Sequence, residues 1–269
     1  EVDFNRNMRR NFNDLYNELE YLLKKNLNQM IPRERKFASI ISGGIDSSLI
    51  TKYLNEICDP NLLIAIDHVG KDTITKNLKY FENKLQKKIK TISVDEKIYI
   101  KNLLEISRSY LTPIHSHSFV SLYILSKYCN TKKCKAIFGG EGADELFGGY
   151  DTYNQNIQKY DKNFSKYSMI NKPDLFINED NYSFFHKKID KNWIYNFETY
   201  SFIKNKNEQN KQASMLTDTN LQLSTVGLRG ADLMCMRSSI EQRSIFLRKD
   251  IIKFALNLPI KHKINKKEN

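Results

Sequence analysis

The sequence predicts an α/β protein with a mainly parallel, twisted β-sheet, helices on both faces of that sheet, and a helical C-terminal lobe. Two observations lead to this prediction. Between residues 37 and 140, short apolar runs alternate with longer amphipathic segments, as in successive strand–helix units. After residue 150 the chain becomes aromatic, polar and rich in lysine, which favours helices joined by long surface loops.

The first predicted element is an amphipathic helix that precedes Pro32. Residues 9–30 carry apolar side chains at nearly helical spacing, namely Phe12, Leu15, Leu19, Leu22 and Leu23. We therefore interpret residues 1–36 as a helical lead-in segment.

The following elements alternate between strand and helix. The predicted strands are FASII (37–41), NLLIAID (61–67), KTISV (90–94) and KAIFGG (135–140). The predicted helices lie near residues 46–57, 73–88, 97–110 and 117–129. In a sheet built this way, ligands bind at the carboxyl ends of the strands.

Composition bounds the class of protein. The 269 residues are 40% hydrophobic, which is enough for a sizeable core. The chain has no apolar run of about 18 residues and no secretory h-region near its start, so we expect a cytoplasmic protein without a membrane partner. Its four cysteines are widely spaced and predict reduced thiols rather than a disulfide framework or a zinc site.

The chain carries a formal charge of +12. Such a charge fits a polyanionic partner such as RNA, or a field that attracts anionic substrates. The lysines are scattered through Asn- and Ile-rich stretches rather than gathered into a stripe with aromatic residues. This pattern favours a compositional bias of the source as the origin of the net charge. We therefore expect no specific nucleic-acid partner.

The stretch SGGIDSS, residues 42–48, lies between a predicted strand and a predicted helix. Its glycines allow a sharp turn and close backbone approach, and a helix N-terminus attracts phosphate oxygens. Asp46 makes sense beside phosphates if it holds Mg²⁺. An ordinary glycine turn with a helix N-cap would fit the same residues. The stretch resembles the SGGxDS pyrophosphate loop of the ATP pyrophosphatases, which cleave ATP between its α and β phosphates.

A second stretch, FGGEGADELFGGY, covers residues 138–150 and clusters three acids at a strand end. Such a cluster fits a metal site, catalytic carboxylates or a solvated acidic turn. It is very similar to the SGEGADELFGGY signature of the asparagine synthetase class. Residues 227–264 resemble the C-terminal region of the same class, so the likeness covers about residues 37–264, with little contribution from residues 151–215.

The resemblance implies a PP-loop nucleotide-binding domain over residues 37–150 and a mainly helical lobe over residues 151–269 that completes the acceptor site. It also implies roles for single residues. ATP and its pyrophosphate would contact Ile41, Ser42, Gly43, Gly44, Asp46, Ser47, Ser48, Ile66, Gly139 and Gly140. The catalytic residues would be Asp46 and Glu141, Mg²⁺ would bind Asp46 and Asp144, and the acceptor would contact Glu141, Asp232 and Glu241.

The chemistry that the resemblance implies is amide synthesis. A carboxylic acid acceptor attacks the α-phosphate of ATP, AMP and pyrophosphate are formed, Mg²⁺ neutralises charge, and ammonia attacks the acyl-adenylate. The acceptor region departs from the class: Leu233 replaces the arginine of DRMSM, and SIFLR stands where VPFLD is usual. Acceptors other than aspartate, such as a uronic acid of a surface polysaccharide, therefore stay open, and so does a PP-loop enzyme that modifies tRNA.

The chain begins with Glu1 and not with Met, which indicates a piece of a longer product. Glutamine-dependent members of the class carry a glutaminase domain before the synthetase domain, and the class continues beyond FALNLP into a segment with a lysine near the α-phosphate. We expect this chain alone to use no glutamine and to be weak in adenylation. A longer product would supply the glutaminase domain and the segment with the lysine near the α-phosphate. A separate glutaminase domain or subunit would supply the ammonia.

Overall fold

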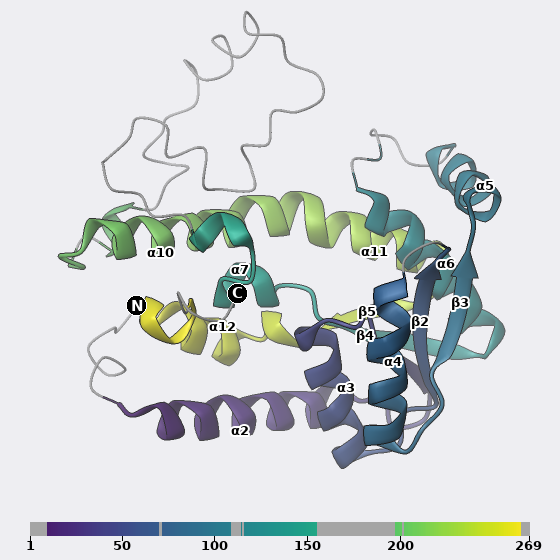
Figure 1. Cartoon of the computed structure of the whole chain (residues 1–269), viewed down its shortest axis with the longest axis horizontal. Coiled ribbons are helices and arrows are strands. Elements are labelled where there is room, and N and C mark those ends of the chain that lie inside the picture. Colours follow the sequence, from purple (N-terminus) through teal and green to yellow (C-terminus); the bar gives the residue numbers. More distant parts are fainter. Residues whose placement is uncertain are drawn as a thin grey trace, which may run out of the picture. The chain divides into compact units, whose positions relative to one another are not determined.

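The computed structural model describes residues 10–69, 72–108, 114, 116–154, 197–200 and 202–264. The chain divides into two compact units. The first, which we call the sheet unit, comprises Glu20–Glu141 and Leu228–Arg248. The second, which we call the helical unit, comprises Glu1–Leu19, Gly142–Gly227 and Lys249–Asn269. Figure 1 labels the helices and strands along the chain.

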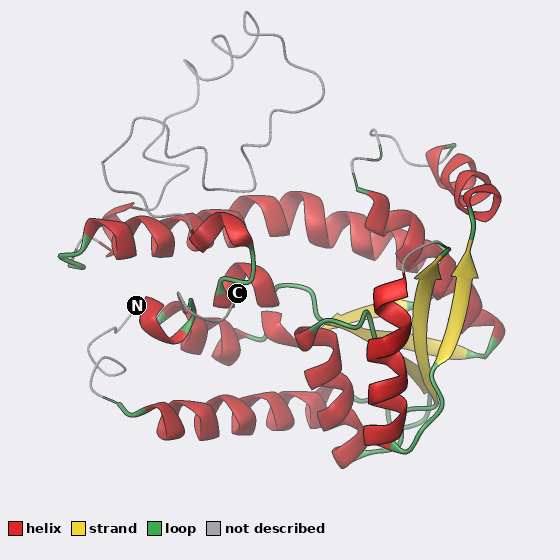
Figure 2. Ribbon diagram, in the orientation of Figure 1, coloured by secondary structure: helices red, strands yellow, loops and turns green. Residues whose placement is uncertain are grey.

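The sheet unit contains a five-stranded sheet in which every strand runs parallel to its neighbours (Figure 2). The strand order is β3-β2-β1-β4-β5. The strands are β1 (Lys36–Ile40), β2 (Leu62–His68), β3 (Lys90–Val94), β4 (Cys134–Gly139) and β5 (Glu241–Ser244). This arrangement confirms the predicted α/β class with a parallel sheet.

The helices of the sheet unit follow the predicted alternation. They are α3 (Ile45–Ile57), α4 (Asp72–Leu85), α5 (Glu96–Ser107), α6 (His117–Thr131) and α11 (Leu228–Met236), together with most of α2 (Phe12–Met30). Capping residues fix where two of them begin: the Asp95 carboxylate accepts a hydrogen bond from the Ile98 amide at the start of α5, and the Ser116 hydroxyl accepts one from the Ser118 amide at the start of α6.

Helices cover both faces of the sheet. Because side chains alternate along a strand, Leu63 and Ala65 of β2 point to one face and Ile64 and Ile66 to the other. The first pair packs in an apolar cluster with Leu78 of α4. The second pair packs in a larger cluster to which α6 and α11 contribute most of the remaining side chains. This confirms the expectation of helices on both faces.

The helical unit contains no strand among its described residues. Its elements are α7 (Ala143–Phe147), α10 (Lys206–Asp218), the π-helical turn η5 (Thr219–Gly227), α12 (Lys249–Leu256), and the 3-10 helices η1 (Asp151–Asn154), η4 (Phe197–Tyr200) and η7 (Ile260–His262). Tyr153, Met215 and Ile260 form one apolar cluster, and Tyr200, Ala213 and Leu216 form another. The described residues of this unit are thus helical, in keeping with the predicted fold class, whereas residues 228–248 of the predicted C-terminal lobe belong to the sheet unit.

The structure differs from the predicted elements in two respects. The helix predicted to reach residue 88 ends at Leu85, and the one predicted to reach residue 110 ends at Ser107, beyond which residues 109–113 lie outside the described part. In addition, the lysine-rich C-terminal half supplies a fifth strand. β5 has the sequence EQRS, whose polar side chains suit an edge strand and give no apolar signal.

Within the described residues, no helix combines the length and apolarity that spanning a membrane requires.

Candidate functional site

The loop after β1 turns sharply and opens α3. Gly43 has φ +85°, a left-handed conformation that glycine adopts without strain, and the Asn77 amide donates to its carbonyl oxygen over 3.3 Å. Gly44 is the N-cap of α3, and no side chain caps the helix there. The first backbone N–H groups of α3 are therefore available to an anion.

Three serine hydroxyls organise this loop. The Ser47 hydroxyl lies 2.9 Å from that of Ser42 and accepts a hydrogen bond from the Ser42 amide over 3.1 Å. The Ser48 hydroxyl donates to the Gly44 carbonyl over 2.6 Å. Ser47 and Ser48 are buried, whereas Ser42 and Gly44 are exposed. The loop thus has a rigid base and a solvent-facing rim of donors.

The loop after β4 lies against the first loop. β1 and β4 are paired neighbours, so their carboxyl ends meet at one edge of the sheet. A Cβ atom built on Gly140 would stand 3.0 Å from the Cβ atom of Asp46 and 3.1 Å from the amide nitrogen of Ser47. Glycine at this position allows the two backbones to approach closely. The structure therefore brings the predicted residues of loop 42–48 together with Gly139 and Gly140.

Glu141 places a carboxyl group next to these loops. The residue as a whole is half-buried, but its Oε2 atom is inaccessible and has no hydrogen-bond partner among the described residues. Burial raises the pKa of Glu141, and the nearby Gln242 amide offsets part of that rise. A carboxyl held this way favours its protonated form and is available to a ligand that satisfies Oε2.

Glycine at position 139 is required by the same carboxyl. A Cβ atom there would stand 2.3 Å from Glu141 Oε2, so any other residue would displace the carboxyl from its place. The sequence motif FGGEG thus encodes two close approaches, one at Gly139 and one at Gly140.

Cys235 of α11 lies within electrostatic reach of two carboxyls, those of Glu141 and Asp232. Cys235 is fully buried, and burial raises the pKa of its thiol, to which the charges of Glu141 and Asp232 add. Both carboxyls therefore lie within electrostatic reach of one thiol. Asp232 itself is exposed. Of the predicted acceptor contacts, the structure brings Glu141 and Asp232 into one region.

Glu241 is placed differently. It is the first residue of β5 and pairs with Ala136, whereas the carboxyl end of β5 is at Ser244, opposite Gly139. Its side chain binds Arg243, with Nη2 and Oε2 2.9 Å apart, and Arg243 also donates to the Met30 carbonyl at the end of α2. The structure does not bring Glu241 together with the two loops.

Two predicted adenosine contacts lie in the cores on either side of the sheet. Ile41 is fully buried in the cluster with Leu63 and Leu78, and its amide donates to the Ile64 carbonyl over 2.9 Å. Ile66 lies in β2 and packs in the larger cluster. Their side chains support the two loops from inside the sheet unit.

Asp144 belongs to the helical unit, in the first turn of α7, and burial raises the pKa of its carboxyl. The last three residues of the motif FGGEGADELFGGY, residues 148–150, determine where this helix ends. Gly148 ends it with φ +80°, and a Cβ atom on Gly149 would stand 1.9 Å from Asp144 Oδ1. The neighbouring Glu145 is buried and accepts a hydrogen bond from the Tyr150 hydroxyl over 2.8 Å.

The donor chemistry of the predicted metal ligands suits Mg²⁺. In the described residues, no group of three or more His, Cys, Asp or Glu side chains could hold a metal ion. Mg²⁺ needs no such cage, because it commonly binds one or two carboxylates together with water and substrate phosphates. Asp46, half-buried in the first turn of α3 beside the backbone N–H groups that open the helix, fits that pattern.

Sequence reasoning missed two residues of this region. Gln242 lies beside Glu141 because β5 joins the sheet next to β4, and Asn77, within α4, donates a hydrogen bond to Gly43. Neither stands in a recognisable motif. Because the sequence of β5 is polar, it gave no signal for a strand that would carry Gln242. Asn77 is far from the loop in sequence, and only the folded chain brings it there.

Comparison with known proteins agrees with the motifs. The family model described as asparagine synthase matches residues 18–269. A putative glutamine-hydrolysing asparagine synthetase of Methanocaldococcus jannaschii is 26% identical over 255 residues, which is 93% of this chain and 38% of that protein. A glutamine-hydrolysing asparagine synthetase of Bacillus subtilis is 27% identical over 58% of this chain and 26% of its own length. The chain thus spans well under half the length of these relatives.

Proposed function

Because the chain belongs to the asparagine synthase family, we propose that it takes part in ATP-dependent amide synthesis, in which a carboxylic acid acceptor is adenylated, AMP and pyrophosphate are formed, and ammonia displaces AMP. The observation that supports this most directly is the contact between the two glycine loops. It sets the open N-terminus of α3, Asp46 and the Glu141 carboxyl at one edge of the sheet.

We assign the phosphates of ATP to the loop of residues 42–48. Backbone N–H groups at the start of α3 and the Ser42 hydroxyl would bind phosphate oxygens, as at other helix N-termini. Asp46 would bind Mg²⁺, and the family resemblance assigns the same role to Asp144; the ion would supply positive charge to the departing pyrophosphate. The Ile41 and Ile66 positions and the Gly139 and Gly140 backbone would flank the adenosine.

Glu141 would act at the reacting carbonyl. Its protonated form, which burial favours, would donate a hydrogen bond to the acyl-adenylate, and its ionised form would accept a proton from the attacking ammonia. Gln242 would orient this carboxyl. The buried Oε2 atom, which has no hydrogen-bond partner among the described residues, supports the assignment because it can accept a hydrogen bond from a ligand.

The proposed acceptor is a carboxylic acid, and the residues of α11 indicate that this acid need not be aspartate. Leu233, at the position where the family has an arginine, exposes 42% of its surface beside Asp232. Arg248, at the end of SIFLR, binds Asn26 Oδ1 of α2 over 3.0 Å. An apolar side chain cannot pair with a small dicarboxylate. A non-aspartate acceptor, such as a uronic acid, is therefore the second candidate.

We further propose a cytoplasmic protein whose ammonia comes from a glutaminase domain or subunit. The relatives named above are described as glutamine-hydrolysing, and this chain spans 38% of the first of them. The proposal of a tRNA-modifying enzyme has less support, because the asparagine synthase model covers residues 18–269.

The test combines binding with product analysis. Titration of the chain with ATP and Mg²⁺ should show binding that Asp46→Asn weakens strongly and that the exposed control Glu96→Gln leaves unchanged. With ammonium, ATP, Mg²⁺ and a panel of carboxylic acids, labelled ATP should yield AMP and pyrophosphate. Formation of ADP and phosphate instead would show that the reaction class is wrong, whatever the acceptor.

A further inference from the structure

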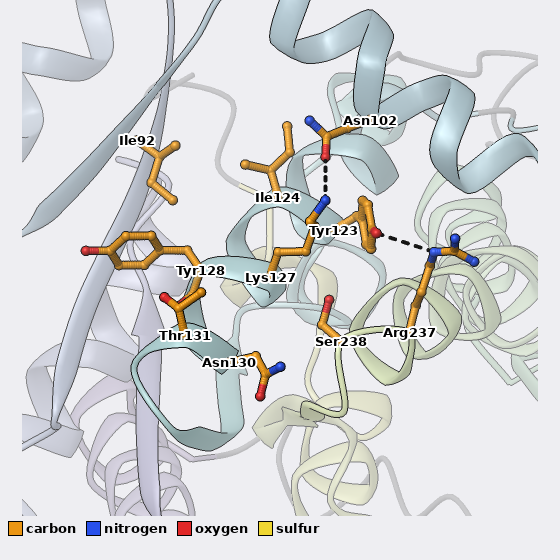
Figure 3. A pocket seen from close by; sticks show the side chains of 10 residues that line it. All are labelled: Ile92, Asn102, Tyr123, Ile124, Lys127, Tyr128, Asn130, Thr131, Arg237 and Ser238. Carbon is orange, nitrogen blue, oxygen red and sulfur yellow. Dashed lines mark hydrogen bonds between the residues drawn. The ribbon is translucent and has the colours of Figure 1, made fainter.

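A concave pocket of about 550 Å³ lies on the sheet unit outside the region described above. Figure 3 shows its lining, which comes from β3, α5, α6 and the turn after α11. Ile92 and Ile124 supply an apolar wall, and Asn130, Thr131 and Ser238 supply polar groups at its rim. The volume lies within the range of ordinary small-molecule sites.

The pocket is at the other end of the sheet from the two glycine loops. Asn130 and Thr131 end α6 just before β4 begins at Cys134, and Ser238 precedes β5, which begins at Glu241. Both segments therefore lead into the amino ends of their strands, whereas loops 42–48 and 139–141 follow the carboxyl ends. A ligand here would not compete with ATP.

Four cations gather around two tyrosine rings of α6. Lys127 Nζ lies 5.0 Å from the centre of the Tyr123 ring, and the Arg237 guanidinium carbon lies 5.7 Å from it. The Tyr128 ring has Lys132 Nζ at 5.3 Å and Lys90 Nζ at 5.8 Å. These distances are typical of cation–π contacts, which hold each charge in place without neutralising it.

Glu105 is the counter-charge within this group. Its carboxylate lies 2.8 Å from Lys127 Nζ and accepts a hydrogen bond from the Tyr123 hydroxyl over 2.5 Å. Figure 3 shows Lys127 directed toward Asn102 and Arg237 toward the Tyr123 hydroxyl, at 3.4 Å in both cases. The Glu105 carboxylate raises the pKa of Lys127, so its ammonium stays charged at neutral pH.

Of the four cations, Lys127 and Arg237 line the pocket itself. Arg237 donates from Nε to the Tyr123 hydroxyl and from Nη2 to the Glu105 carbonyl over 3.3 Å, so its guanidinium is held at the pocket wall. Like charges repel when they are brought together, and a bound anion would offset the repulsion that the Glu105 carboxylate leaves. Carboxylate ligands and phosphate ligands both satisfy this requirement, but a guanidinium and an ammonium together with the hydroxyl and amide groups of Thr131 and Asn130 match the several oxygens of a phosphate group best.

We propose that this pocket binds a small organic phosphate, with its phosphate group near Lys127 and Arg237 and its organic part against Ile92 and Ile124. The concave shape favours a small molecule over the phosphate backbone of RNA, which has the same charged group. The site is separate from the proposed function, so each can fail without the other.

Phenyl phosphate is a suitable probe, because it pairs one phosphate with a small apolar body. Isothermal titration at 150 mM salt should detect its binding and no binding of phenol. Arg237→Gln and Lys127→Gln should each weaken binding by about tenfold, since each removes a positive charge that attracts the phosphate. Lys97→Gln, an exposed lysine of α5 outside this pocket, is the matched control and should leave the affinity unchanged.

Glu105→Gln separates electrostatics from a folding defect. Removal of this carboxylate should tighten phenyl phosphate binding, whereas general damage to the pocket would weaken it in all three variants. Circular dichroism checks that each variant is folded. The site is refuted if phenyl phosphate does not bind, or if Arg237→Gln and Lys127→Gln bind it as the parent does. It is also refuted if a ten-nucleotide uridine RNA binds at 150 mM salt with Arg237 dependence while phenyl phosphate does not, because the anion would then be RNA.

Discussion

The backbone of Gly140 packs so closely against Asp46 that a methyl group at position 140 would push its neighbours aside. The Cβ–Cβ separation in an alanine variant would be 3.0 Å, and the new carbon would also lie 3.1 Å from the amide nitrogen of Ser47. Position 140 thus fixes the spacing between the loop after β4 and the start of α3. The proposed nucleotide site depends on that spacing.

Gly140→Ala should therefore separate the two loops. We expect ATP affinity to fall by about tenfold, the equivalent of about 1.4 kcal/mol, because the shift moves Asp46 and the backbone amide of Ser47 away from their places at the start of α3. Overpacking should also lower the free energy of unfolding by about 1–3 kcal/mol. Titration with ATP and Mg²⁺ and urea unfolding measure the two effects.

Gly227→Ala is the matched control. Its Cβ atom would meet the end of the flexible Leu223 side chain at 3.4 Å, an ordinary contact. We expect unchanged ATP binding and equal or slightly higher stability. If Gly140→Ala binds ATP as well as the parent, the close approach at Gly140 has no role in nucleotide binding.

Glu141→Gln should stabilise the protein at neutral pH while it abolishes amide synthesis. Burial raises the pKa of Glu141 above its unfolded value of 4.5, so the folded state holds more protons than the unfolded chain just above pH 4.5. The free energy of unfolding therefore falls as pH rises from 4.5 through the pKa of Glu141 in the folded state. Above that pKa the buried, ionised carboxylate lowers the free energy of unfolding most. Glutamine removes that cost.

Unfolding measured at several pH values between 4 and 8 tests the sign. The difference between Glu141→Gln and the parent should grow with pH, and product formation should fall by about a hundredfold or more, as for loss of a general acid or base. The same substitution at exposed Glu96 should change neither quantity. A variant that keeps full activity would exclude Glu141 from the chemistry.

Much of the sheet unit could be predicted from the sequence because the physical causes are local. Short, largely apolar runs predict the four strands β1 to β4, and glycine at position 43 is needed for a backbone with φ +85°. The close approach at Gly140 could be expected only as a general property of glycine-rich loops, since its partner Asp46 is 94 positions away in the chain.

The acceptor region was harder to predict, because its geometry depends on a strand with a polar sequence. β5 pairs with β4 in a register that places Gln242 beside Ile137 and Glu241 beside Ala136. That register sets Gln242 near Glu141 and leaves Glu241 in an ion pair with Arg243. Adjacent residues of a strand point to opposite faces of the sheet. Sequence spacing alone does not show whether Glu241 or Gln242 points toward Glu141.

Lys263 makes the helical unit sensitive to pH. Its Nζ atom donates to Gln212 Oε1 over 3.0 Å, and burial lowers the pKa of Lys263 to about 7. An unfolded lysine has a pKa of about 10.4. Between these values the unfolded chain holds more protons, so the free energy of unfolding should rise with pH from about 7 to about 10, by at most about 1.4 kcal/mol per pH unit.

Lys263→Met should flatten this pH dependence, whatever its effect on absolute stability through the lost hydrogen bond. The exposed neighbour Lys261→Met is the control and should retain the slope of the parent. Chemical unfolding at pH 7, 8, 9 and 10 gives the comparison. Equal slopes for Lys263→Met and the parent would show that the Lys263 amine is charged in the folded state.

Gly230 of α11 allows the ring of Phe119 to lie against the helix backbone. A Cβ atom at position 230 would stand 1.9 Å from Phe119 Cζ, and Phe119 is buried in the larger core cluster of the sheet unit. Gly230→Ala gains helix propensity but forces the ring out of place, and the second effect is larger. We expect a loss of about 1–3 kcal/mol in the free energy of unfolding.

A second substitution tests this cause directly. Phe119→Leu alone should lower the free energy of unfolding, because it leaves a cavity, but in the Gly230→Ala background it should cost much less or restore stability. The coupling between contacting positions is typically about 0.5–3 kcal/mol, and urea unfolding of the two single variants and the double variant measures it. Strictly additive losses would mean that Gly230→Ala destabilises α11 for a reason other than the Phe119 ring.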